Sequence, residues 1–182
     1  MKYPLLIILL TLFSFQTLQA QDVIDQDVSD RNELKLNAFN LIAFTAIDIN
    51  YERLINEEAS FGTGLFINTG DDNDFGYYRT FSLTPYYRQF FSKRYAKGFF
   101  VEGFAMLNSG KEIYDLFLED QGGQAREDSF TAFALGISVG GKFVTTRGFV
   151  AEIYAGIGRN LFGVDLAPEV IGRGGISLGF RF

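Results

Sequence analysis

From Leu34 to the C-terminus, apolar and polar residues alternate along the chain with a period of two. The clearest case is the last segment, Arg173–Phe182, in which every second residue is a large apolar one. Such alternation is typical of a β-strand with one apolar and one polar face. Similar segments occur at about 34–42, 45–55, 60–68, 77–91, 98–108, 129–143, 148–158 and 173–182. The pattern therefore predicts an all-β protein of eight strands.

The predicted connections differ in length in an ordered way. Short ones (56–59, 92–97 and 144–147) alternate with longer ones rich in Gly, Asp or Asn (69–76, 109–128 and 159–172). The first connection, near Ala43, is also short and departs from this order. An even number of strands of roughly 9–11 residues, joined alternately by short and long connections, is typical of antiparallel barrels that cross an outer membrane. We therefore expect an eight-stranded antiparallel up-and-down transmembrane β-barrel.

The composition of the two faces predicts which one points inward. The polar face carries four acidic and four basic residues, which are Lys35, Asp48, Glu52, Arg88, Glu102, Lys142, Glu152 and Arg181. It also carries Gly62, Gly64, Gly136, Gly140, Gly156, Gly158 and Gly179. Glycine makes room in a narrow lumen, whereas a solvated outer surface needs no such room. We expect the charges to pair inside the barrel and close its lumen, because buried charges must be paired.

Aromatic residues on the apolar face gather at one end of the predicted barrel. Each lies beside a short turn or at the C-terminus, and the set comprises Tyr51, Phe61, Tyr87, Phe99, Phe143, Phe149 and Phe182. A ring of this kind is typical of the membrane–water interface of a membrane barrel. Pro85 lies in the middle of a predicted strand, where its missing N–H predicts a bulge or an overhang.

The first 33 residues of the sequence predict a targeting segment and an arm before the barrel. Residues 1–20 have a positive start at Lys2, an apolar run of 11 residues (Leu5–Phe15) and a small residue, Ala20, at the expected cleavage point. These features are typical of a secretory signal peptide, with a buried N-terminal helix as the alternative. Residues 21–33 are polar and acidic and are interpreted as a flexible arm. The barrel is assigned to residues 34–182.

The composition limits the kinds of catalytic and metal-binding site that the chain can form. The chain has no His and no Cys, and its formal net charge is −6. These absences exclude a Ser-His-Asp triad, a Cys nucleophile and a His-ligated zinc site, so we expect no catalytic, cofactor-binding or metal-binding residues. The acidic balance disfavours nucleic acid as a partner. Asp71–Asp74 is interpreted as a solvated loop with calcium binding as the alternative, and residues 110–119 predict a short amphipathic helix.

The terminal strand, with Ile176, Leu178, Phe180 and the final Phe182, resembles the signal that the barrel-assembly machinery of Gram-negative outer membranes reads. Ser82–Phe91 followed by Gly98–Gly103 resembles bacterial families described only as outer-membrane barrels of unknown function. The whole plan is similar to the small eight-stranded OmpA-, OmpX- and OmpW-like proteins. This resemblance implies integration in the cell outer membrane, with lipid, lipopolysaccharide and the assembly machinery as partners. It implies no particular activity or extracellular partner.

Three functions are compatible with these observations. The first is a non-enzymatic outer-membrane barrel with a structural or surface-interaction role and a lumen closed by charges. The second is a transporter of small apolar molecules of the OmpW-like type, with a side exit through the wall. The third is a soluble periplasmic binding barrel of the lipocalin type, which requires the apolar face to point inward.

Overall fold

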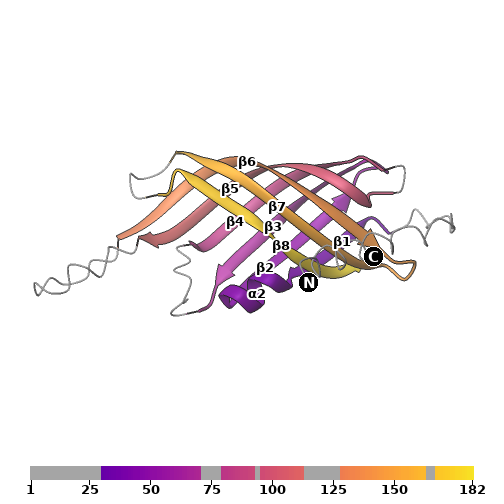
Figure 1. Ribbon diagram of the computed structural model, residues 1–182, viewed down its shortest axis with the longest axis horizontal. Coiled ribbons are helices and arrows are strands. Elements are labelled where there is room, and N and C mark those ends of the chain that lie inside the picture. Colours follow the sequence, from indigo (N-terminus) through magenta and orange to yellow (C-terminus); the bar gives the residue numbers. More distant parts are fainter. Residues whose placement is uncertain (1–29, 71–78, 93–94, 113–127, 163–166) are drawn as a thin grey trace, which may run out of the picture.

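The computed structural model describes residues 30–70, 79–92, 95–112, 128–162 and 167–182. Eight antiparallel strands close into a barrel in sequence order, with the last strand beside the first (Figure 1). The strands are β1 (Asn32–Asn37), β2 (Ala46–Leu54), β3 (Ala59–Asn68), β4 (Arg79–Phe90), β5 (Gly98–Glu112), β6 (Asp128–Val144), β7 (Phe149–Phe162) and β8 (Val170–Arg181). A helix, α2 (Ala38–Phe44), lies between β1 and β2. The structure confirms the predicted all-β class and the eight-stranded antiparallel closed barrel.

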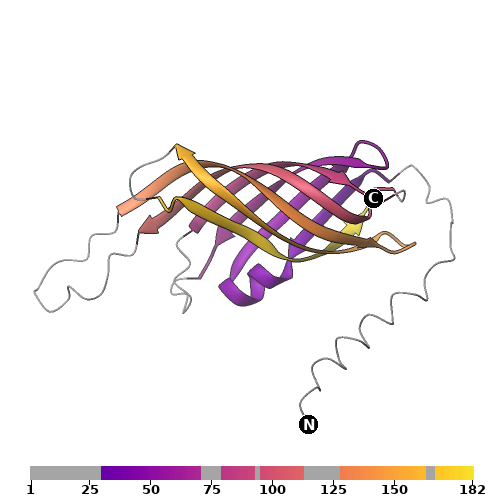
Figure 2. The same ribbon diagram turned by 45° about the horizontal axis from the view of Figure 1, so that its top comes forward.

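The barrel closes between its first and last strands, β1 and β8. The backbone N–H of Asn32 donates to the carbonyl of Phe182 at 2.9 Å, and the N–H of Phe182 donates back to Asn32 at 2.8 Å. This junction lies at the same end as the short connections, and the strands run from it at a tilt to the barrel axis (Figure 2). At the opposite end, β5, β6 and β7 reach farther than the predicted boundaries of their segments.

The alternating residues of each strand point in turn to the interior and to the outer surface of the barrel. In the middle of β2, the polar residues Asp48, Asn50 and Glu52 are buried, and the apolar residues Ile47, Ile49 and Tyr51 that alternate with them are exposed. Two small groups of buried apolar side chains also lie inside the barrel. One, at the end with the short turns, comprises Leu54, Phe90, Ala96, Phe100 and Tyr154. The other, farther along the strands, comprises Tyr86, Phe104, Met106, Ala134 and Ile171.

The first strand is shorter than predicted, because a helix replaces its second half. β1 ends at Asn37, whose side chain accepts a hydrogen bond from the backbone N–H of Asn40 at 3.2 Å and so caps α2. The helix ends at Thr45, which adopts a left-handed backbone conformation with φ of 51°. An asparagine cap followed by Ala and Leu favours a helix, although the apolar positions fit a strand equally well. The prediction of a strand over 34–42 and a short turn near Ala43 was wrong here.

The bulge or overhang predicted at Pro85 is not present in the register of the strands. The register does not shift at Pro85, since Leu83 pairs with Leu107 and Tyr86 with Phe104. Proline lacks the N–H that a ladder bond needs, so pairing with β5 is interrupted without an inserted residue. The irregularity of β4 lies instead between Arg79 and Phe81.

The longest predicted connection, 109–128, begins and ends in strand. Residues 109–112 continue β5 and do not start a helix, while 113–127 lie outside the described residues. The predicted signal peptide, residues 21–29 of the arm and the candidate calcium loop Asp71–Asp74 lie outside them too. No helix in the described ranges is long and apolar enough to cross a membrane.

The lumen glycines make room mainly for aromatic rings. A Cβ added to Gly140 would lie 2.5 Å from the Phe100 ring and 2.6 Å from the Ile153 carbonyl, whereas one added to the outward-facing Gly141 meets nothing within 4 Å. We therefore expect Gly140→Ala to lower the free energy of unfolding by about 1–3 kcal/mol through overpacking. Gly141→Ala, the matched control, leaves it nearly unchanged. Urea-induced unfolding followed by far-ultraviolet circular dichroism measures both, and equal effects of the two substitutions would contradict the assigned faces.

Candidate functional site

The eight charged residues predicted for the lumen all lie inside the barrel, and each is at most 8% exposed. The structure adds two members that the sequence analysis did not select, Glu33 and Arg173. Glu33 was assigned to the arm, although it has the same strand parity as Lys35. Extending the first predicted strand by one residue would have found Glu33. Arg173 already lies in the last predicted strand with the parity of Arg181, so the alternation alone was enough to select it.

Arg88 lies at the centre of the ionic network. Its guanidinium donates to three carboxylates that come from different strands: Glu52 at 2.8 Å, Glu102 at 2.7 Å and Glu152 at 2.7 and 3.0 Å. Lys35 bridges two of the same acids, at 2.5 Å from Glu52 and 2.7 Å from Glu152. Arg88 and Lys35 are fully buried. A buried guanidinium is stable only with such complete pairing, because its desolvation is costly.

Glu52 connects this centre to the rest of the barrel. Besides Lys35 and Arg88, it accepts hydrogen bonds from Lys142 at 2.6 Å and from the Ser60 hydroxyl at 2.6 Å. These donors come from β1, β4, β6 and β3. A single carboxylate on β2 therefore holds side chains from four other strands.

The network extends toward both ends of the barrel. At the end with the short turns, Glu33 binds Lys142 at 2.8 Å and Arg181 at 2.7 Å. Toward the other end, Glu102 binds Arg173, so that ion pairs continue along the lumen. The interior thus contains charged side chains of both signs that are bound to one another. These buried charges cannot be left unpaired without a large cost in free energy, so the arrangement holds the side chains of several strands together.

Aromatic rings surround the arginines. The Arg88 guanidinium carbon lies 4.3 Å from the centre of the Phe100 ring and 4.5 Å from that of Tyr86. Arg173 lies 5.0 Å from Tyr86 and 5.1 Å from Tyr154. Cation–π contacts strengthen when they are desolvated. They add packing to the ionic network and leave the arginines little freedom to move.

Asp48 is separate from the ionic network, in contrast to the prediction that all eight charges pair. Among the described residues it forms no ion pair, and its carboxylate accepts hydrogen bonds from the side-chain amides of Asn37 (2.9 Å), Asn40 (2.7 Å) and Asn50 (2.9 Å). The carboxylate thus joins β1, α2 and β2. Hydrogen bonds from several amides stabilise a buried carboxylate in place of a cation.

The aromatic residues predicted to form a girdle all lie on the outer surface, from 36% exposed at Phe149 to 68% at Phe143. The strand bounds place them near the end of the barrel that carries the short turns and the C-terminus. Some contact one another or a polar neighbour: Phe149 packs edge to face on Phe180, and the Tyr51 hydroxyl donates to Asn32 at 2.7 Å. The predicted assembly residues Ile176, Leu178, Phe180 and Phe182 also point outward from the end of the chain. Their role in the membrane stays a prediction.

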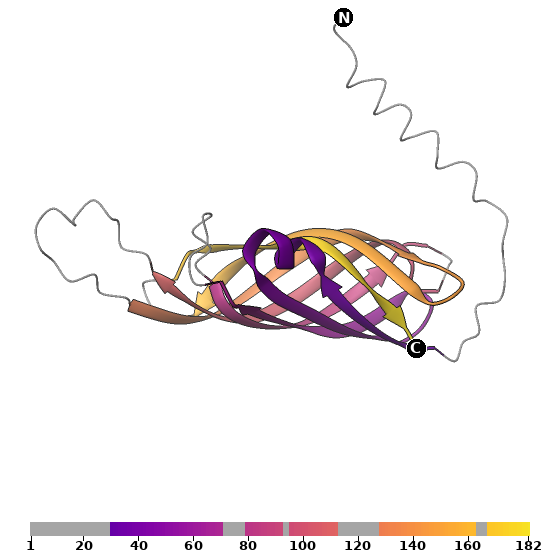
Figure 3. The same cartoon turned by 90° about the horizontal axis from the view of Figure 1, so that it is seen from below.

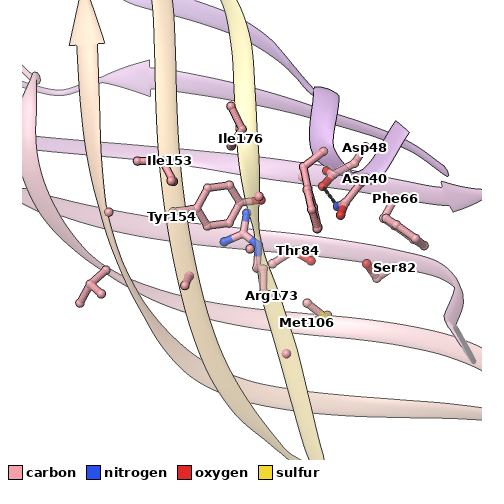
Figure 4. Close-up of a pocket in the computed structure, with 18 of the residues that line it drawn as sticks. Asn40, Asp48, Phe66, Ser82, Thr84, Met106, Ile153, Tyr154, Arg173 and Ile176 are labelled. Atoms are coloured by element: carbon pink, nitrogen blue, oxygen red, sulfur yellow. Dashed lines mark hydrogen bonds between the residues drawn. The ribbon is translucent and has the colours of Figure 1, made fainter. Parts of the chain in front are cut away.

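A cavity of about 790 Å³ lies beside α2, above the ionic network. Figure 4 shows Arg173, Tyr154 and Thr84 directed into it, with Asp48 and Asn40 hydrogen-bonded to each other at the helix. Its lining also includes residues that face outward, among them Val139, Ile153 and Ile176. The lining thus includes residues from both faces of the wall. No sequence signal indicated it, because it depends on the unpredicted helix.

Comparison with protein-family models, with curated proteins and with solved structures finds no match for this chain.

The ionic network gives a matched test of burial. We expect Arg88→Met to destabilise the barrel by about 3–5 kcal/mol, because three buried carboxylates lose their shared cation. Arg159→Met removes a pair with Glu169 whose side chains are both 68% exposed, and should cost less than about 1 kcal/mol. Urea unfolding of both variants provides the comparison. A small effect of Arg88→Met would mean that water or other lumen groups replace the guanidinium.

Proposed function

We propose that this chain is a non-enzymatic integral β-barrel of a Gram-negative outer membrane, with a structural or surface-interaction role and a lumen closed by charges. The observation that carries the proposal is the inverted distribution of side chains. Charged residues such as Arg88 and Glu52 are fully buried inside, while Ile137, Ile153 and Ile157 are 63%, 58% and 58% exposed outside. Large continuous apolar surfaces mark contact with another apolar phase, and an outward apolar band is typical of a membrane barrel.

The same distribution argues against a soluble periplasmic barrel of the lipocalin type. Such a barrel holds its ligand among apolar side chains inside and presents polar ones to water. Here, buried ion pairs cross the interior beside two small groups of apolar side chains. The partners that the proposal implies are outer-membrane lipid and lipopolysaccharide around the wall. Ile176, Leu178, Phe180 and Phe182 would be read by the barrel-assembly machinery during biogenesis.

The extent of the ionic network supports a structural role over free conduction. Arg88, Lys35 and Lys142 each bind two or more carboxylates across the lumen. A solute that passed along the axis would have to separate these buried pairs, and each broken pair leaves an uncompensated charge. We therefore expect any interaction with a partner to involve the outer surface or the end with the long connections, since loops on such scaffolds carry function.

A second candidate function is passage of small apolar molecules of the OmpW-like type. The cavity beside α2 favours it, because its lining joins lumen-facing and outward-facing residues. A molecule that entered there would leave or reach the lipid through the wall and would not need the axial path.

Membrane location has a direct test. Cells that express the chain are fractionated, and the outer-membrane fraction is run on SDS gels with and without boiling. Because a closed membrane barrel resists SDS until heated, we expect an outer-membrane band whose mobility changes on boiling. Recovery of the chain as a soluble periplasmic protein without a mobility change would overturn the proposal.

A substitution on the outer surface tests whether that surface contacts lipid or water. Ile137 lies near the middle of β6 and is 63% exposed. In a bilayer, Ile137→Arg should lower the stability of the folded barrel by about 2–4 kcal/mol, whereas in water an exposed Arg is nearly neutral. Thr146→Arg, in an exposed turn, is the control. Folding into phospholipid vesicles in urea measures both, and indistinguishable stabilities would count against lipid contact at Ile137.

A further inference from the structure

The apolar outer surface of the barrel differs in length from strand to strand. β6 exposes apolar side chains from Leu135 to Phe143, and β7 does so from Phe149 to Ile157. At about 3.3 Å per residue, each of these runs covers about 26 Å of strand, whereas the run of β2, from Ile47 to Tyr51, covers about 13 Å. β1 has six residues and exposes only Leu34 and Leu36. The apolar surface that the strands form is therefore shortest at β1 and β2.

The helix α2 lies at this short part of the wall. β1 is paired with β2 as far as Leu36 opposite Ile49, and with β8 as far as Asn37 opposite Ser177. Residues 170–176 of β8 therefore have no pairing partner on β1. The helix contacts both β2 and β8 and lies at mid-length of the barrel (Figure 3). It takes the place that a longer β1 would occupy.

Polar backbone groups around α2 are bonded within the protein. At its start, Asn37 accepts from the N–H of Asn40, and its amide also donates to the carbonyl of Gly174 on the unpaired part of β8. At its end, the Thr45 N–H donates to the Asn40 carbonyl, and the Thr45 carbonyl accepts from Thr69. In hydrocarbon, backbone polar groups must be satisfied internally. A capped helix meets this condition better than an irregular loop does.

The side chains of α2 are those of a segment in contact with an apolar phase. The helix, Ala38–Phe44, contains no charged residue, and its one buried side chain, Asn40, donates to Asp48 at 2.7 Å. Ile42 is 83% exposed, Phe39 47% and Leu41 42%. Helices that lie at the membrane–water interface carry a strongly charged or polar face with Lys or Arg. The composition of α2 therefore favours the hydrocarbon phase over the head-group region.

The exposed side chains of α2 continue the apolar surface on both sides of the helix. Ile47 and Ile49 of β2 are each 39% exposed, and Ile176 and Leu178 of β8 are 47% and 42% exposed. Every one of the eight strands exposes large apolar residues in the same way. A surrounding apolar phase accounts for a surface that extends around the whole barrel, whereas a single partner would cover one part of it.

We propose that α2 is a lipid-facing part of the barrel wall, and that the hydrocarbon chains of the bilayer contact Phe39, Leu41 and Ile42. The helix replaces the missing part of β1 and extends the apolar surface where the strands alone leave it short. The inference rests on the proposed membrane location, and it names the element and the phase that meet at this side of the barrel.

The absence of cysteine from the chain allows a nitroxide to be attached at one chosen position. Ile42→Cys places it on α2, Ile137→Cys on the outer surface of β6, Phe143→Cys near a short turn and Thr146→Cys in that exposed turn. Each purified variant is folded into phosphatidylcholine vesicles. Electron paramagnetic resonance then measures collisions of the label with oxygen, which concentrates in hydrocarbon, and with a water-soluble nickel chelate. Leu41→Cys is the alternative if Ile42→Cys does not fold.

We expect the ratio of oxygen to nickel collisions at Ile42 to equal that at Ile137 and to be several-fold higher than that at Thr146. It should also exceed the ratio at Phe143, because α2 lies at mid-length and Phe143 lies beside a turn. A ratio at Ile42 no higher than that at Phe143, with Ile137 in hydrocarbon, would overturn the proposal for α2 alone. Low ratios at both Ile42 and Ile137 would overturn the membrane location.

A second copy of the chain on α2 would give a different result. Collisions at Ile42 would then be rare with both reagents, and labels on the two copies would broaden each other's spectra, which would also overturn lipid contact. A charge provides an independent measurement, since an ionised side chain in hydrocarbon is costly. We expect Ile42→Arg to lower the folded fraction in the same vesicles as strongly as Ile137→Arg does, and Ile42→Met, the matched control, to leave it unchanged. Equal effects of Arg and Met at position 42 would contradict lipid contact there.

Discussion

The pairing of charges inside a narrow barrel is the constraint on which the rest of this structure depends. Removing Glu52 and Arg88 from water is costly, and the cost is offset only because each meets several partners at hydrogen-bond distance. Those partners come from β1, β3, β4 and β6 as well as β2. The requirement therefore couples the registers of strands that are far apart in the sequence, and a shift of one residue in any of them would turn a charge toward the outside.

The space that these side chains need determines where small residues and aromatic rings lie. Glycines such as Gly140 remove side chains where a ring like Phe100 crosses the lumen, and the rings in turn pack on the guanidinium groups. With the interior occupied in this way, the large apolar residues remain for the outer surface. An exterior of exposed Ile, Leu and Phe is thus the counterpart of the buried ionic network, and it motivates the proposed membrane location.

The ionic network and the side cavity divide the interior between two tasks. Ion pairs of the network cross the lumen, while the cavity lies at the place where β1 gives way to α2. Arg173 belongs to both regions, since it binds Glu102 of the network and borders the cavity. Asp48 also borders the cavity, and its hydrogen bonds to Asn37 and Asn40 join β2 to β1 and to α2.

The sequence by itself determined the number of strands, their antiparallel order and the face on which Arg88, Glu52 and the other predicted charges lie. It could do so because strand alternation is a local property with a period of two. Only the tertiary structure decided the replacement of the second half of β1 by α2, since the Asn40–Asp48 bond that holds this helix joins residues of different elements. The same holds for the amide partners of Asp48, the ion pairs of Glu33 and Arg173, and the side cavity. Each depends on which side chains meet across a closed lumen, and that is settled by strand register and closure over the whole chain.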